Sequence, residues 1–351
     1  MNRREFLGSA AAFAAVGMKP VLAGDYAALA ASKKWFKEAQ FGMMAHWGLY
    51  TLLGGEWRGK KARHTYGEWI QHSEQIPMKD YAALARAFNP ILFDPLDWMK
   101  RARDAGMKYF VLTSKHHDGF AMYRSKVSKY NVVDATPFKR DVVGELAEAC
   151  RTVGLKFGLY YSQDLDWSDR NGGGLNTLCN WPYGRHPWNN FWEYGEKEGY
   201  DFQKYLDEKS MPQVEEILTQ YGDLCLIWFD VPMTLTRAQS EAFVKLVRKH
   251  QPCCLISGRI GNGLGDYETP DDNAIAKNAD PSKLYETVGT MNDSWGYRPT
   301  DVNYRSVKQI LDIKAKCASI GSNYMLNFGP DPLGRMPVAA VDILQGIAAA
   351  R

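Results

Sequence analysis

The chain alternates short apolar runs with longer amphipathic ones. Short apolar runs predict strands buried on both faces, and the amphipathic runs between them predict helices. The predicted strands span residues 41–45, 109–115, 156–160, 224–229, 253–258 and 323–328. The predicted helices span residues 94–106, 142–153, 212–221, 237–250, 307–318 and 337–350. Such alternation predicts an α/β fold with parallel strands and right-handed crossovers. Repeated βα units, with no glycine-rich phosphate loop after the first strand, favour a closed (β/α)8-like (TIM) barrel over an open sheet.

Polar residues follow several of the predicted strands at the point where each ends. His46 follows the first strand, His116 and His117 follow the second, and Asp230 follows the run Leu224–Phe229. Asp230 alone could be the N-cap of the next helix. Three histidines at successive strand ends, with an aspartate at a later one, are hard to explain by packing. Because barrel enzymes carry their chemistry at the C-terminal strand ends, this pattern favours a catalytic site.

Two long segments lie outside the βα pattern. Residues 164–209 are rich in tryptophan and tyrosine, and residues 259–281 are first rich in glycine and then in acidic residues. Long segments without secondary structure are uncommon in compact domains and are usually functional loops or lids.

Composition narrows the function classes. The net charge of +3 and the absence of a Lys/Arg run argue against nucleic acid as a partner. The aromatic content is 13% and includes 11 Trp, which suits either sugar stacking or a bulky core. The six cysteines show no CxxC spacing, so we expect no zinc site, and we expect no metal or organic cofactor.

The N-terminus is predicted to be an export signal. Residues 1–23 carry the pair Arg3-Arg4, a weakly apolar stretch and a small-residue site at Val21-Leu22-Ala23, as in a twin-arginine signal peptide. We therefore expect a periplasmic or secreted protein whose barrel spans residues 24–351. No other segment is apolar and long enough to suggest a membrane span, so no membrane contact is expected after signal removal.

Seven segments in order make the chain resemble the retaining α-L-fucosidases of glycoside hydrolase family 29. They are Phe41–Gly48, Tyr66–Trp69, Lys115–Phe120, Gly158–Ser162, Trp228–Asp230, Trp295–Tyr297 and Leu326–Pro330. The resemblance covers about residue 33 to residue 351. Members usually carry a β-sandwich after the barrel, and we expect none here because the sequence stops just after the last predicted barrel helix.

The resemblance implies a set of site residues. It makes Asp230 the catalytic nucleophile. It implies that a fucose pocket is lined by His46, Glu68, Trp69, His116, His117, Tyr161, Trp228 and Arg259, and Trp295 offers a further ring for the sugar. Retaining hydrolysis needs two carboxyl groups roughly 5–5.5 Å apart, one attacking the anomeric carbon and one protonating the leaving oxygen.

The sequence departs from the family pattern beside both carboxyl groups. Val231 follows the nucleophile where Gly is common, and a β-branched residue there is strained if the backbone needs a positive φ. For the acid/base, Asp271 is the first choice, followed by Glu286 and then Glu268. Glu286 could equally belong to a buried structural ion pair.

The resemblance implies a retaining exo-α-L-fucosidase that removes terminal α-L-fucose from glycans by double displacement. Its partner would be a fucosylated oligosaccharide or glycoconjugate. Two alternatives remain open from the sequence. One is a non-catalytic fucose-binding barrel, and the other is a retaining glycosidase for a related sugar such as galactose.

Overall fold

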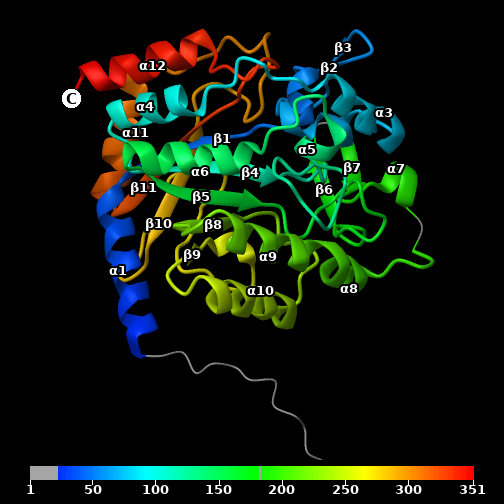
Figure 1. Cartoon of the computed structure of the whole chain (residues 1–351), viewed down its shortest axis with the longest axis horizontal. Helices are drawn as coiled ribbons and strands as arrows, with labels where there is room; N and C mark the ends of the chain where they lie inside the picture. The colour runs from blue at the N-terminus through cyan, green and yellow to red at the C-terminus, as the bar shows by residue number, and fades with distance from the viewer. Residues whose placement is uncertain (1–22, 182, 196) are drawn as a thin grey trace, which may run out of the picture.

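The computed structural model describes residues 23–181, 183–195 and 197–351 (Figure 1). Of the predicted signal peptide, residues 1–23, only Ala23 lies within the described residues. Among the described residues, no helix is both long and apolar enough to cross a membrane.

A sheet of seven parallel strands forms the centre of the molecule, in the order β10-β11-β1-β4-β5-β8-β9 (Figure 1). The strands are β1 (Phe41–Ala45), β4 (Tyr109–Lys115), β5 (Lys156–Tyr161), β8 (Leu226–Phe229), β9 (Leu255–Ile256), β10 (Tyr285–Thr290) and β11 (Ser322–Phe328). The prediction of a parallel (β/α)8-like fold is confirmed, because the sheet curls as such barrels do. β10 was missed by the sequence analysis because its residues, YETVGT, form no apolar run.

The two edges of the sheet are joined by a segment of only a few residues. Tyr267 forms a parallel bridge with Ser257, just after β9, and Glu268 forms one with Tyr285, at the start of β10. The short segment 266–268 therefore takes the position of an eighth strand. Because it follows a glycine-rich stretch, no hydrophobic pattern marked it in the sequence.

Helices pack around the outside of the sheet; the one at residues 23–39 was not predicted from the sequence, and the other longer ones lie in the predicted places. The longer ones are α1 (Ala23–Ala39), α4 (Pro95–Asp104), α6 (Val142–Val153), α9 (Met211–Gln220), α10 (Arg237–His250), α11 (Val307–Ser319) and α12 (Val338–Ala349). Capping residues explain where these helices begin and end. Asp94 caps the start of α4 ahead of Pro95, and Gly154 ends α6 with a φ of 78°. In Figure 1, α1 lies at the end of the sheet where the strands begin, opposite the end to which their arrows point.

The smaller elements gather at the end to which the strands point (Figure 1). They are α2 (Ile70–Ser73), α3 (Met78–Ala83), α5 (Val132–Ala135), α7 (Phe191–Tyr194), α8 (Phe202–Tyr205) and the hairpins β2–β3 (Glu56–Trp57, Lys60–Lys61) and β6–β7 (Leu178–Trp181, Gly184–Pro187). The segment 164–209 is thus not structureless, since it contains β6, β7, α7 and α8.

Strand alternation divides the core into an inner and an outer part. Tyr160 packs inside the barrel with Tyr109 and Trp228, whereas its neighbour Tyr161 packs outside, in the larger cluster beneath the helices. Successive side chains of a strand point to opposite faces, so two adjacent tyrosines cannot both face the interior.

Candidate active site

A cavity of about 560 Å³ lies at the C-terminal ends of the strands. Most of the residues predicted for the site line it. They are His46, Glu68, Trp69, His116, His117, Trp228, Asp230, Arg259, Asp271 and Trp295. Sequence reasoning missed several other lining residues: Met44, Tyr66, Trp181, Trp188, Pro232, Met233, Thr269, Pro270 and Asp272.

Asp230 is held from three sides at the end of β8. The Tyr160 hydroxyl donates to its Oδ2 at 2.8 Å, and the Arg259 guanidinium contacts Oδ1 at 2.9 Å. Its backbone N–H donates to Gln163 at 2.8 Å. The side chain is nearly buried, so the carboxylate has little freedom to turn. A carboxylate fixed in this way at the edge of a cavity is prepared to act as a nucleophile.

Val231 adopts the left-handed backbone conformation that the sequence analysis identified as the condition for strain. Its φ is 49°, a value at which a β-branched residue is an outlier. Such strain persists where the surrounding structure imposes it, and it is concentrated at functional sites.

A second carboxylate shares the same arginine. Arg259 donates from Nη1 to Asp230 and from Nη2 to Asp272, at 2.9 and 2.8 Å. Two carboxylates on one planar guanidinium are close neighbours. Asp271 also lines the cavity, but it is exposed and its carboxylate has no hydrogen-bond partner among the described residues.

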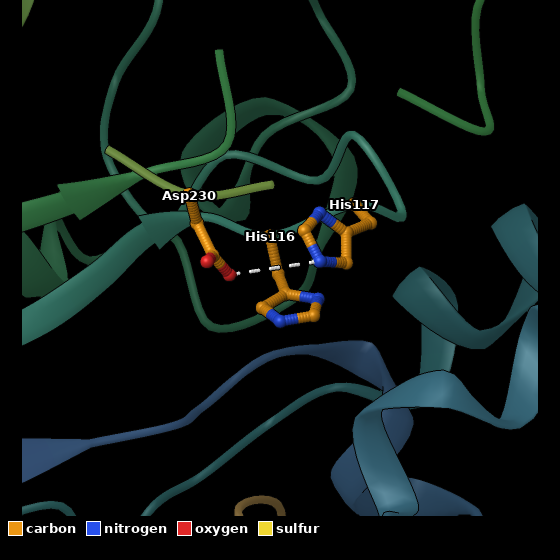
Figure 2. A group of neighbouring side chains, drawn as sticks. All are labelled: His116, His117 and Asp230. Atoms are coloured by element: carbon orange, nitrogen blue, oxygen red, sulfur yellow. Dashed lines mark ion pairs between the residues drawn. The ribbon is translucent and has the colours of Figure 1, made fainter. Parts of the chain in front are cut away.

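The protonation state of His117 follows from its neighbours. Ser162 donates its hydroxyl to the Leu165 carbonyl at 2.9 Å, so its oxygen accepts from Nδ1–H of His117 at 2.6 Å. The other ring nitrogen, Nε2, then carries a lone pair and lies 3.8 Å from Asp230 Oδ2 (Figure 2). Burial holds the pKa of His117 well below 6.5, so this ring is neutral at neutral pH. His117 Nε2 and Asp230 Oδ2 are both hydrogen-bond acceptors and face each other, so a donor such as a sugar hydroxyl can bind between them.

His46 is oriented in the same way. Asn327 donates its amide nitrogen to the Trp295 carbonyl at 2.8 Å, which leaves its oxygen to accept from His46 Nδ1–H at 2.7 Å. Burial lowers the pKa of His46 to about 4. His116, whose pKa burial also lowers well below 6.5, stacks on Tyr160 with ring centres 5.4 Å apart. The floor of the cavity is therefore lined by neutral imidazoles with nitrogen acceptors.

Glu68 is a buried carboxyl in the cavity wall. Its Oε2 accepts from the backbone N–H of Gly296 at 2.7 Å. Burial raises its pKa to about 8, so the group is mostly protonated at pH 7. A neutral carboxyl both donates and accepts, which suits a sugar hydroxyl.

Tyr161 does not lie in the cavity, contrary to expectation. Its hydroxyl donates to Gln213 at 2.9 Å on the outside of the barrel. Tyr160 faces the interior instead and reaches Asp230. The register of β5 against its neighbours decides which tyrosine faces in, and alternation along β5 is the signal that could have identified Tyr160.

Two acid/base candidates lie away from the cavity. Glu286 is buried inside the barrel, where it accepts from the Tyr109 hydroxyl at 2.7 Å and from Trp228 Nε1 at 3.1 Å. Burial raises its pKa to about 7. Glu268 belongs to the closing segment and pairs with Lys283 at 3.0 Å, with about half of its side chain exposed. Neither carboxyl lines the cavity.

His116, His117 and Asp230 also have the residue types of a metal site. One candidate ligand atom from each lies within 4.8 Å of the others (Figure 2). However, both oxygens of Asp230 are already engaged by Tyr160 and Arg259, and the Arg259 cation opposes a second cation nearby. The geometry favours a hydroxyl-bearing ligand over a metal ion at this place.

The fold and the site have the arrangement of barrel-type glycoside hydrolases. Carboxyl groups at the C-terminal end of the barrel, aromatic rings and neutral histidines are the groups needed to hold a sugar and cleave its glycosidic bond. The comparisons agree with this class. The family model described as Alpha-L-fucosidase matches residues 24–349. The chain belongs to the α-L-fucosidase family.

Two solved structures illustrate the similarity. Unliganded α-L-fucosidase AlfC from Lactobacillus casei is 50% identical, with a TM-score of 0.87, and the match covers 91% of this chain and 98% of that one. The α-L-fucosidase from Vibrio sp. strain EJY3 is 36% identical, with a TM-score of 0.82, over 91% of this chain and 55% of that one.

Curated relatives are more distant and longer. The tissue α-L-fucosidase of Rattus norvegicus is 29% identical over 86% of this chain and 64% of its own length. That of Homo sapiens is 30% identical over 84% of this chain and 62% of its own length. The chain thus spans less than two thirds of these relatives.

Proposed function

We propose that this chain is a retaining exo-α-L-fucosidase, which hydrolyses terminal α-L-fucose from glycans by double displacement. The observation that carries the proposal is the pair of carboxylates, Asp230 and Asp272, hydrogen-bonded to the single guanidinium of Arg259 in a sugar-sized cavity. Retaining enzymes need two carboxyl groups roughly 5–5.5 Å apart. Asp230 and Asp272 both line the cavity, whereas Glu286 and Glu268 do not.

Asp230 is proposed as the nucleophile. It attacks the anomeric carbon, forms a fucosyl ester, and is released when water attacks the same carbon. Tyr160 and Arg259 hold its two oxygens, so its attack needs little reorganisation. The neutral His46 and His117 accept hydrogen bonds from the sugar hydroxyls, and Glu68 supplies a further donor.

The general acid is proposed to lie in the loop 269–272. Asp271 is the residue expected from the sequence, and Asp272 is the one fixed beside the nucleophile by Arg259. We assign the role to Asp272, because a catalytic acid needs a fixed position relative to the nucleophile.

The substrate is proposed to be a fucosylated glycan. AlfC, the similar enzyme of Lactobacillus casei, has been crystallised with α-L-fucose as product and with Fucα(1,6)GlcNAc. An α(1,6)-linked fucosyl-GlcNAc is therefore the first disaccharide to test.

Two measurements test the assignment. A 2-fluoro-fucosyl fluoride should trap the ester, and mass spectrometry should locate the label on Asp230; a label on another carboxylate would end that role. Asp272→Gly should slow substrates with poor leaving groups far more than activated aryl fucosides, and azide should rescue it. Asp271→Gly is the matched control from the same loop. Rescue of Asp271→Gly alone would return the role to Asp271.

The cellular location is a separate proposal. Residues 1–23 are proposed to direct twin-arginine export to the periplasm or beyond, because Arg3 and Arg4 precede a weakly apolar segment. Replacing both arginines by lysine should leave uncut, active precursor in the cytoplasm. Unchanged export of that variant would contradict the proposal.

A further inference from the structure

The cavity is larger than one fucose requires. Fucose has about 11 non-hydrogen atoms, and at no more than roughly 30 Å³ each, the share of a water molecule in the liquid, it fills at most about 330 Å³. The cavity measures about 560 Å³. The remaining volume is sufficient for part of a second sugar ring.

The lining residues outside the predicted fucose pocket are mainly apolar. Trp181 and Trp188 come from the segment after β5, and Val231, Pro232 and Met233 come from the segment after β8. Met233 is one of the more exposed large apolar side chains in the described part of the molecule. Because an exposed apolar surface is unfavourable in water, such a lining indicates contact with a ligand.

The hairpin β6–β7 is fixed in place against this wall. Thr177, just before β6, donates to the Met233 carbonyl at 3.3 Å, and the backbone of Gly174 donates to Thr234 at 2.6 Å. Trp167 donates its indole N–H to the Trp188 carbonyl at 2.9 Å. The segments that follow β5 and β8 are therefore joined into one surface.

The two hairpin tryptophans continue the aromatic wall of the inner pocket. Trp181 and Trp188 pack on Trp69 with ring centres 5.0 and 5.4 Å apart, and they lie 5.4 Å from each other. Both rings remain only partly buried. The faces of these two rings are therefore left to line the cavity.

The strain at Val231 is an independent sign of function in the same place. A positive φ is sterically unfavourable for an L-residue, and a glycine would avoid that cost. Val231 packs against the buried cluster of Trp69, Leu165 and Trp167, against which Trp181 and Trp188 pack as well. The strained backbone thus adds an apolar side chain to this wall, directly beside the nucleophile.

We propose that Trp181, Trp188 and Val231 form the subsite for the leaving group, and that this leaving group is a sugar ring. The inference rests on the proposed function. A pyranose presents an apolar C–H face, which stacks on tryptophan, and hydroxyls at its edge, which suit the exposed Asp271 at the rim. A charged or peptide leaving group would gain little from these surfaces.

The test compares two substrates that differ only in the leaving group. Fucosyl fluoride loses a single atom, whereas Fucα(1,6)GlcNAc loses a whole sugar. The ratio of their kcat/KM values is independent of how much enzyme is folded. Trp181→Ala and Trp188→Ala should each lower kcat/KM for the disaccharide, relative to kcat/KM for the fluoride, by about tenfold. This is the effect expected from losing one aromatic stacking contact.

Trp192→Ala is the matched control. Trp192 lies in the same insert and packs in the same cluster, but it does not line the cavity, so its substitution should leave the ratio unchanged. Trp188→Phe, which keeps an aromatic face, should restore most of the ratio and remains informative if an alanine variant fails to fold.

Two outcomes would overturn the subsite. One is that neither alanine variant lowers kcat/KM for either substrate, and the other is an equal loss for both substrates, which leaves the ratio unchanged and would assign the rings to the fucose pocket. A wild-type enzyme that cleaves neither substrate would instead refute the proposed function, and the subsite with it.

Discussion

The buried carboxyl of Glu68 gives a prediction whose size follows from the structure. Its pKa rises from 4.5 to about 8, mainly because burial disfavours the charged form, and Asp272 adds repulsion. The folded chain therefore keeps this proton to a higher pH than the unfolded chain does. Between pH 4.5 and 8 the unfolded state binds fewer protons, so the contribution of Glu68 to stability falls as the pH rises.

The magnitude is about 1.4 kcal/mol for each pH unit within that window. Over the whole window, the burial of Glu68 lowers the free energy of unfolding by at most about 5 kcal/mol, reached above pH 8. At pH 7 the lowering is about 3 kcal/mol. Glu68→Gln removes the titration and keeps the volume, and its amide oxygen can still accept from Gly296. The variant should therefore become more stable than the wild type as the pH increases.

Urea unfolding of both proteins at pH 5, 6, 7 and 8 measures this effect. The difference in free energy of unfolding should grow by about 3–4 kcal/mol over the series. Glu268→Gln is the matched control, because it makes the same substitution at a half-exposed carboxyl outside the cavity. Parallel curves for wild type and Glu68→Gln would refute the assignment of a protonated carboxyl at this position.

Four further predictions concern the nucleophile and its surroundings. Asp230→Asn should keep the fold, measured by circular dichroism, and should lower kcat by several orders of magnitude, because the covalent step is lost. Tyr160→Phe should lower kcat by about tenfold or more, since a hydrogen bond to a charged group contributes about 1.5–3 kcal/mol. Tyr161→Phe should leave kcat unchanged and cost only about 1 kcal/mol in urea unfolding, for loss of the bond to Gln213; equal losses of kcat in both tyrosine variants would contradict the placement of these side chains. Activity should survive EDTA, and loss on chelation that zinc restores would support a metal role for His116 and His117.

The regular part of the fold could be predicted because each unit has its own local signal. The helix at 142–153 was predicted to the residue, since Asp141 and Gly154 mark its ends. The strand expected at 253–258 has only the two residues of β9, because the chain turns into a 3₁₀ helix at Gly258. Closure of the barrel through residues 266–268 depends on backbone pairing that no side-chain pattern records.

The site was predictable where a residue type and a strand end coincide. His46, His116, His117 and Asp230 met both conditions, and all four line the cavity. Tyr160 and Asp272 were missed because their roles depend on where their side chains point. For Tyr160 the question is which face of β5 turns inward, and for Asp272 it is which of two adjacent aspartates contacts Arg259. Direction follows from tertiary packing, which a single sequence does not contain.

Glu286 is a buried carboxyl that lies away from the cavity and is connected to it through other side chains. It accepts from Trp228, whose ring in turn lies under the Arg259 guanidinium, 4.7 Å from its centre, and against Tyr160. Arg259 and Tyr160 are the two side chains that hold the oxygens of Asp230. Barrel interiors are usually filled with branched aliphatic residues, whose contacts have little direction. Here hydrogen bonds and stacked rings connect the interior to the nucleophile, so Glu286 acts on the geometry of the site from below, through Trp228, without contact with the cavity.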